Sequence, residues 1–132
     1  MVLDGRELVE SLRSQVKEIN VSQLHEICQH KGDTIVIDIR EAAETKAGFI
    51  PDALLIPRGV LEMSISCEES LKKRFSSLAM LAEQPIYLVC RSGARSVLAA
   101  ISLQQMGFEN VYSVAGGFLA WQAAGYVCSD KS

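Results

Sequence analysis

Short, continuous apolar runs constrain the fold of this chain more than any other feature. Residues 34–38 (TIVID) and 85–90 (PIYLVC) are mainly apolar, with several β-branched side chains and no alternation of polar and apolar positions. Such runs are typical of strands that are buried on both faces, as in parallel sheets. Two shorter runs, at residues 53–56 and 111–114, predict two further strands.

Between these runs, apolar residues recur at the spacing of helices. Asp4, followed three residues later by Glu7, has the pattern of a capping box and predicts a helix over residues 5–17. Ser22 is the expected N-cap of a second helix, which runs through residue 30. Further helices are expected as two short ones within residues 59–83, at residues 96–106 and at residues 118–124. Strands that alternate with helices predict an α/β domain with a largely parallel sheet.

The length of 132 residues is sufficient for one domain. We expect residues 1–17 to be an N-terminal helical extension and residues 18–132 to be the domain. The formal net charge of −3 argues against a general electrostatic grip on nucleic acid. No apolar run approaches the roughly 18 residues of a membrane helix. The first residues carry charges where a signal peptide has its apolar core, so we expect a cytoplasmic protein without membrane or nucleic-acid partners.

The chain has four widely spaced cysteines and no Cys-x-x-Cys pair: Cys28, Cys67, Cys90 and Cys128. In a reducing compartment we expect four free thiols. Zinc ligands usually come in closely spaced pairs, so no metal site is expected. Cys67 and Cys128 are interpreted as incidental, and the alternative is that one of them acts as a resolving cysteine that forms a disulfide with Cys90 in a redox relay.

Cys90 differs from the other cysteines in the residues that follow it. It ends a predicted strand, and Arg91-Ser92-Gly93-Ala94-Arg95-Ser96 leads from it into a predicted helix. Ligands of parallel α/β sheets bind beyond the carboxyl ends of strands. Loop amides, a helix N-terminus and two arginines favour an anion there, and they favour the nucleophilic thiolate. The hypothesis is a nucleophilic Cys90 in an anion-binding cradle, and the alternative is a buried cysteine that only packs.

The segment Cys-Arg-Ser-Gly-Ala-Arg-Ser at residues 90–96 resembles the active-site loop of rhodanese domains, sulfurtransferases that carry sulfur as a cysteine persulfide. The resemblance covers about residues 19–126. It includes five further segments in the family's order, at residues 36–41, 48–53, 56–62, 107–111 and 116–121. It implies an α/β rhodanese-like domain, with a central, mostly parallel five-stranded sheet that is flanked by helices on both faces.

The sequence departs from the family pattern at two positions. Phe49 replaces the usual histidine and Asp52 the usual second glycine, although aspartate tolerates unusual backbone angles better than most residues. Related phosphatases carry Cys-x5-Arg, whereas Cys90 to Arg95 is Cys-x4-Arg, and Val89 stands where those phosphatases have histidine. Loop length and flank resemble the sulfurtransferase branch, while phosphatase and arsenate reductase are the less favoured alternatives.

The resemblance implies covalent catalysis in two steps. Cys90 takes the outer sulfur of thiosulfate or a similar donor as a persulfide, and then passes it to cyanide, a thiol or a protein acceptor. No cofactor beyond this covalent intermediate is implied. We expect the amides of residues 91–96 to stabilise the persulfide anion, Arg91 to guide the donor and Arg95 to brace the loop. The alternatives are a binding or regulatory module without turnover, and a sulfur carrier that a partner loads. Because Cys90 and both arginines are present, the enzyme is favoured.

Residues outside the loop have supporting roles in this interpretation. Asp38 and Arg40 are expected to form a structural pair at a strand end, and Arg58 is a candidate for the rim of the pocket. Trp121 is expected to anchor the last helix in the core. The helix at residues 5–17 offers a partner surface if its apolar stripe stays exposed, and that suggestion fails if the stripe packs on the domain.

Overall fold

The computed structural model describes residues 1–130. Its centre is a five-stranded sheet in the order β1-β5-β4-β2-β3, and every neighbouring pair is parallel. The strands are β1 (Lys17–Ile19), β2 (Ile35–Asp38), β3 (Leu54–Leu55), β4 (Ile86–Val89) and β5 (Val111–Val114). The expected α/β architecture with a five-stranded sheet is confirmed, and within the described residues the sheet is parallel throughout.

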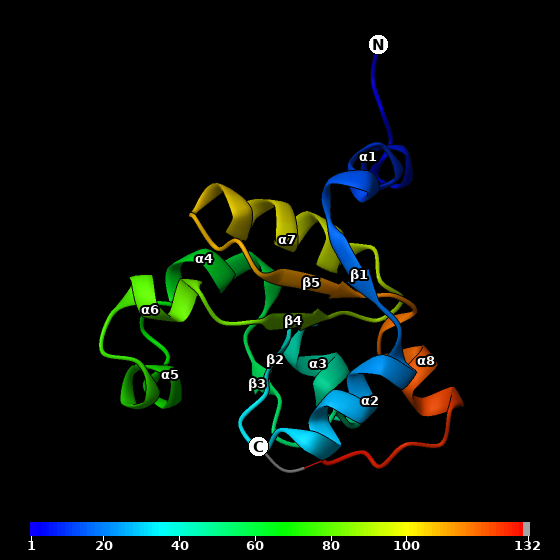
Figure 1. Ribbon diagram of the computed structural model, residues 1–132. Helices are drawn as coiled ribbons and strands as arrows, with labels where there is room; N and C mark the ends of the chain where they lie inside the picture. The colour runs from blue at the N-terminus through cyan, green and yellow to red at the C-terminus, as the bar shows by residue number, and fades with distance from the viewer. Residues whose placement is uncertain (131–132) are drawn as a thin grey trace.

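Helices cover both faces of the sheet (Figure 1). The core on one face includes side chains of α1 (Gly5–Leu12), α4 (Leu61–Ser64), α5 (Glu69–Arg74), α6 (Leu78–Ala82) and α7 (Arg95–Gln105). The core on the other face includes side chains of α2 (Val21–His30) and α8 (Gly117–Ala123). The short helix α3 (Ala42–Thr45) follows β2, and two single 3-10 turns are η1 (Arg13–Gln15) and η2 (Arg58–Val60).

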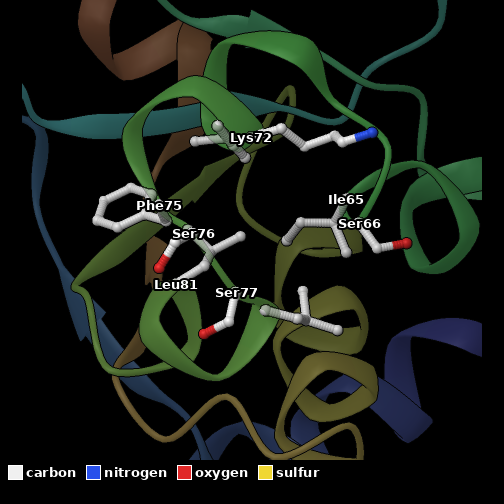
Figure 2. Close-up of a pocket in the computed structure, with 9 residues that line it drawn as sticks. Ile65, Ser66, Lys72, Phe75, Ser76, Ser77 and Leu81 are labelled. Carbon is white, nitrogen blue, oxygen red and sulfur yellow. The ribbon is translucent and has the colours of Figure 1, made fainter.

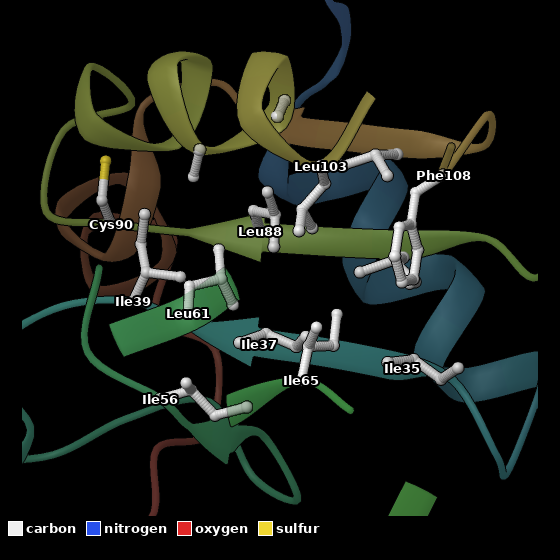
Figure 3. Packing of buried hydrophobic residues seen from close by; sticks show 14 of the residues in the cluster. Ile35, Ile37, Ile39, Ile56, Leu61, Ile65, Leu88, Cys90, Leu103 and Phe108 are labelled. Carbon is white, nitrogen blue, oxygen red and sulfur yellow. The ribbon is translucent and has the colours of Figure 1, made fainter. Parts of the chain in front are cut away.

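The β4 strand shows why its sequence is a continuous apolar run. Ile86 and Leu88 belong to the core on the α7 face, while Tyr87 and Val89 belong to the core on the α8 face. Side chains alternate across a strand, so a strand that is covered on both sides needs apolar residues at every position. Figure 3 shows Leu88 on β4, among the other labelled residues of the first of these cores.

The N-terminal segment begins as predicted but differs from the prediction after Leu12. Asp4 and Glu7 form the expected reciprocal capping box, with each side chain accepting from the other's backbone amide. The helix ends at Leu12 instead of residue 17, and Lys17–Ile19 forms β1 beside β5. Pairing with a strand far along the chain outweighs the helical spacing of these residues, because it buries Val16 and completes the sheet edge.

The N-cap of the second helix is Asn20, two residues before the predicted Ser22. The Asn20 side chain accepts from the Gln23 amide while the Gln23 side chain accepts from the Asn20 amide. Ser22 is therefore the second residue of α2 and not its cap. The reciprocal bonds satisfy the backbone amides of Asn20 and Gln23. Ser22 has no glutamate or glutamine three residues later that could complete such a pair.

Helix α1 packs on the domain. Val9 is buried, Leu12 lies against the core on the α7 face, and α1 contacts α7. Most of the apolar stripe is thus covered and only Leu8 is exposed, so the suggestion that the stripe forms a free partner surface is wrong. The division of the chain at residue 17 stays a prediction. Among the described residues no helix is long and apolar enough to cross a membrane, and the cytoplasmic location stays a prediction.

Candidate active site

Cys90 lies where the sheet changes its winding direction. Strands β2 and β4 are neighbours, but the chain continues from β2 to β3 on one side and from β4 to β5 on the other. Loops that leave adjacent parallel strands in opposite directions open a crevice at the carboxyl edge, where ligands bind in such folds. Figure 3 shows Cys90 just beyond the end of β4, with its sulfur directed toward the first turn of α7. Cys90 thus lies at the carboxyl end of a strand, and its role as a nucleophile stays a prediction.

The Cys90 side chain is surrounded by donors from its own loop. Its Sγ atom accepts hydrogen bonds from the backbone N–H groups of Gly93 (3.1 Å) and Ser96 (3.4 Å). The thiol also lies 3.4 Å from the Ser96 Oγ atom, which in turn lies 2.7 Å from the Ser113 Oγ atom. Cys90 and both serines are buried. Ser96 therefore connects the sulfur to β5, and it does not cap α7, whose N-cap is Ala94.

The start of α8 supports the loop from behind. The carbonyl oxygen of Cys90 accepts from the Phe118 amide at 2.9 Å, and that of Arg91 accepts from the Leu119 amide at 3.1 Å. Gly93 and Gly117 adopt positive φ values of 98° and 57°, which side chains disfavour. These bonds fix the backbone on which the Gly93 amide is aimed at the sulfur. From the sequence, Gly116 and Gly117 were expected only as part of the segment 116–121 that resembles the family, and the two adjacent glycines were the signal for this closer role.

The two arginines of the loop have different environments. Arg91 is exposed, and within residues 1–130 its guanidinium makes no hydrogen bond or ion pair. Arg95 donates two hydrogen bonds of 2.9 Å to the carboxylate of Glu44 in α3. Those hydrogen bonds lower the pKa of Glu44 to about 2, and they raise the pKa of Arg95. Arg95 thus ties the start of α7 to α3, while Arg91 keeps its charge available to a ligand.

Asp38 and Arg40 form a buried ion pair at the end of β2. The Arg40 Nη2 atom lies 2.8 Å from Asp38 Oδ2 and also donates to the carbonyl oxygen of Gly48 at 2.8 Å. The Arg40 guanidinium carbon lies 4.2 Å from the centroid of the Phe118 ring. The pair therefore has the structural contacts expected of it, since it joins β2 to the following loop and to α8.

Arg58 makes its contact away from the loop. Its Nη1 atom lies 2.9 Å from Glu62 Oε2, and Glu62 also accepts a hydrogen bond from Ser102 of α7. The hydrogen bond from Ser102, followed by those of the backbone and Arg58, lowers the pKa of Glu62. This cluster links η2, α4 and α7. The place of Arg58 on the pocket rim stays a prediction.

The turn that departs from the family pattern keeps its shape. Asp52 has a φ of 68° and is the one residue other than glycine with positive φ among those described. Phe49 is buried and pairs with Ser129 in an isolated antiparallel bridge. Aspartate thus takes the backbone conformation that glycine often provides, and an apolar ring fills the place of the histidine.

The remaining cysteines and aromatic residues have ordinary environments. Cys67 and Cys128 are exposed, whereas Cys28 is half-buried, and burial raises the pKa of its thiol. Trp121 is buried as expected, and its Nε1 atom donates to the carbonyl oxygen of Val127 at 2.9 Å. Neither observation connects these residues with the Cys90 loop.

A cavity of about 210 Å³ lies at the helices between β3 and β4. Figure 2 shows its lining, in which Ile65, Phe75 and Leu81 provide apolar surface, and Lys72 reaches past its edge. None of the residues that line it belongs to the segment 90–96. This cavity is therefore separate from the candidate active site.

The fold and the site together define a parallel α/β protein with a cysteine held in an amide-lined loop at the carboxyl edge of its sheet. The model of the rhodanese-like domain family matches residues 20–124, and the chain belongs to this family.

Relatives and solved structures agree with this assignment. A sulfurtransferase of Allochromatium vinosum is 32% identical over 110 residues, which are 83% of this chain and 92% of that protein. The thiosulfate sulfurtransferase GlpE of Pseudoalteromonas translucida is 35% identical over 108 residues, or 82% and 90% of the two chains. The crystal structure of a rhodanese-related protein from Thermoplasma volcanium superposes with a TM-score of 0.69 at 26% identity, and covers 87% of this chain and 99% of that one. The chain is thus a sulfurtransferase homologue by sequence and by fold.

Proposed function

We propose that this protein is a sulfurtransferase that carries sulfane sulfur as a persulfide on Cys90 and accepts it from thiosulfate or a donor of similar chemistry. The observation that carries the proposal is the environment of Cys90, which is buried and whose Sγ atom accepts hydrogen bonds from the backbone amides of Gly93 and Ser96. Amides that are fixed before the reaction stabilise an anion without reorganisation, so this loop suits a thiolate and its persulfide.

The first step loads the enzyme. The Cys90 thiolate attacks the outer sulfur of thiosulfate, and a new S–S bond forms at Sγ. The S–S bond of thiosulfate breaks, and its electron pair leaves with sulfite. Arg91, which is exposed and without a protein partner within the described chain, supplies positive charge for the approaching dianion.

The second step unloads it. A thiolate or cyanide attacks the outer sulfur of the persulfide, and the bond to Cys90 breaks with its electron pair on Sγ. The thiolate is thereby restored, and the acceptor leaves with the added sulfur. Ping-pong kinetics are the signature of this scheme.

Intact mass of the protein tests the proposal. After incubation with thiosulfate we expect a gain of about 32 Da, one sulfur atom held covalently. Cyanide should remove the gain and release thiocyanate. Cys90→Ser should show no gain, while Cys67→Ser, which removes an exposed thiol outside the loop, should behave as the wild type.

The outcomes separate the candidate functions. A gain with polysulfide or with a cysteine-desulfurase partner, but none with thiosulfate, would replace the thiosulfate donor and favour a sulfur carrier. A Cys90 that stays bare with all these donors would contradict sulfur transfer and leave a binding module. A gain that persists in Cys90→Ser would place the chemistry elsewhere.

A further inference from the structure

A cleft of about 500 Å³ lies beside the active-site loop, between that loop and the N-terminal helix. Figure 1 shows α1 close to the beginning of α7, and α1 and α7 are in contact. Residues from the two sides line the cleft: Gly5, Arg6, Val9, Glu10 and Arg13 from the N-terminal segment, and Ser92, Ala94, Arg95 and Leu98 from the loop and α7. Ser92, Ala94 and Arg95, which alternate or adjoin in the loop with the amides that hold the Cys90 sulfur, therefore form one wall of the cleft, while Cys90 itself does not line it.

Arg6 is the cation of this cleft that is not already paired. Arg13 is bound by Glu10 at 3.3 Å and by Glu18 at 2.6 Å, and Arg95 is bound by Glu44. Within residues 1–130, the guanidinium of Arg6 makes no ion pair or hydrogen bond. The nearby carboxylates of Asp4 and Glu7 are engaged with each other's backbone amides. The cleft thus combines apolar surface with one positive charge that a ligand can neutralise.

The size of the cleft points to the second half of the reaction. Small-molecule sites typically enclose about 300–1,000 Å³. Thiosulfate and cyanide have only a few atoms and do not need this space, whereas a peptide-like thiol does. The family model begins at residue 20, so α1 lies outside the region that this chain shares with the family model.

We propose that α1 is the acceptor-binding wall of the active site, and that Arg6 selects peptide-like thiol acceptors that carry a carboxylate. This inference rests on the proposed function. The acceptor thiolate attacks the outer sulfur of the Cys90 persulfide, a new S–S bond forms, and the bond to Sγ breaks with its electrons on Cys90. The acceptor persulfide and the Cys90 thiolate are the products, and no other reactant is needed.

The test follows the second half-reaction alone. The protein is loaded with sulfur, and its unloading is timed by rapid mixing with glutathione, a tripeptide thiol with two carboxylates, or with its diethyl ester. The ester has the same thiol and a similar size but no carboxylates. The variants are Arg6→Ala and Arg6→Glu. Lys73→Ala is the matched control, because it removes one positive charge from an exposed position of α5 that does not line the cleft.

We expect Arg6→Ala to slow unloading by glutathione roughly two- to fivefold, the range of one solvent-exposed charge pair. Arg6→Glu should slow it further, and salt should reduce both effects. Unloading by the diethyl ester should change less than unloading by glutathione. Equal losses with glutathione and with the ester, or an equal loss in Lys73→Ala, would overturn the role of Arg6.

Loading by thiosulfate, measured in the same samples, reports the proposed function separately. If wild-type protein takes up no sulfur from any donor, the proposed function fails and this inference fails with it. If wild-type protein loads and unloads, and the Arg6 variants do the same at unchanged rates with glutathione, only this inference fails.

Discussion

Gly117 packs directly against the backbone of Cys90. An ideal Cβ atom added to Gly117 would lie 2.5 Å from the carbonyl oxygen of Cys90 and 2.6 Å from that of Arg91. These are the carbonyls that accept the first amides of α8. The backbone of Cys90 therefore has its position because the residue that faces it has no side chain.

Gly117→Ala should disrupt the active-site loop. The added methyl group meets backbone atoms that have no room to move, so we expect a loss of about 3 kcal/mol in the free energy of unfolding. Persulfide formation should fall with it. The matched control is Gly125→Ala, since Gly125 has a φ of 78° but nothing within 4 Å of an added Cβ. It should cost about 1 kcal/mol from backbone strain alone. If Gly117→Ala and Gly125→Ala had equal effects on urea unfolding and on persulfide formation, the packing argument would be contradicted.

Ser96→Ala should slow sulfur transfer by more than its loss of stability explains. Its hydroxyl lies 3.4 Å from the Cys90 sulfur, and the Ser113 hydroxyl is its other neighbour. The Cys90 thiol donates to this hydroxyl, whereas a thiolate has no proton and accepts from it, so the loss of the hydroxyl should make persulfide formation roughly tenfold slower. Ser113→Ala removes the serine pair but keeps the hydroxyl at the sulfur. Both variants should lose about 1–2 kcal/mol, because each leaves one buried hydroxyl without its partner. If single-turnover rates fall equally in the two, Ser96 acts only through folding.

Arg91→Ala should weaken the use of anionic donors. Arg91 is exposed and has no protein partner among residues 1–130, so stability should change by less than about 0.5 kcal/mol. The apparent KM for thiosulfate should rise roughly fivefold, and the increase should shrink at high salt. Arg91→Lys keeps the charge and should recover most of the loss. Steady-state kinetics at two ionic strengths measure this, and an unchanged KM would exclude a guiding role.

Glu44→Gln should remove a brace whose strength depends on pH. In the folded protein the pKa of Glu44 is lowered to about 2, whereas an unfolded glutamate titrates near about 4.3. A depressed folded pKa stabilises above the unfolded value, and the contribution is lost as the pH falls toward 2. Because the pair is partly solvent-exposed, we expect a loss of only about 1 kcal/mol at pH 7.

Urea midpoints of wild type and Glu44→Gln should therefore differ by a constant amount between pH 5 and pH 8, and should converge between about pH 4 and pH 2. Glu10→Gln, at an exposed ion pair with Arg13, is the control and should show a smaller difference. A difference for Glu44→Gln that persists undiminished at pH 2 would show that the carboxylate charge is not its cause.

The parts of the fold that sequence predicts are those with local causes. Strands β2 and β4 are buried on both faces, so each has an apolar run that no other element explains. The loop after Cys90 is contiguous, and its arginines and glycine are readable in one segment. The capping box of Asp4 and Glu7 is likewise contained within four residues.

The parts that sequence missed depend on partners far along the chain. Strand β1 exists because Lys17 pairs with Tyr112 of β5, and its three residues carry no strand pattern of their own. Arg95 was expected to brace the loop, but its partner Glu44 lies in another element, as does Ser113, the partner of Ser96. The local sequence around each of these residues does not show which distant residue it will contact in the folded chain.

The bonds from α8 to the carbonyls of Cys90 and Arg91 also set an order of events during synthesis. Cys90 leaves the ribosome before Gly117, Phe118 and Leu119 do, so the nascent chain presents the thiol before the two bonds from α8 can form. A chain interrupted ahead of Gly117 retains the cysteine and lacks the groups that hold its backbone. Each molecule thus completes the backbone support of this loop only once α8 has folded against the sheet.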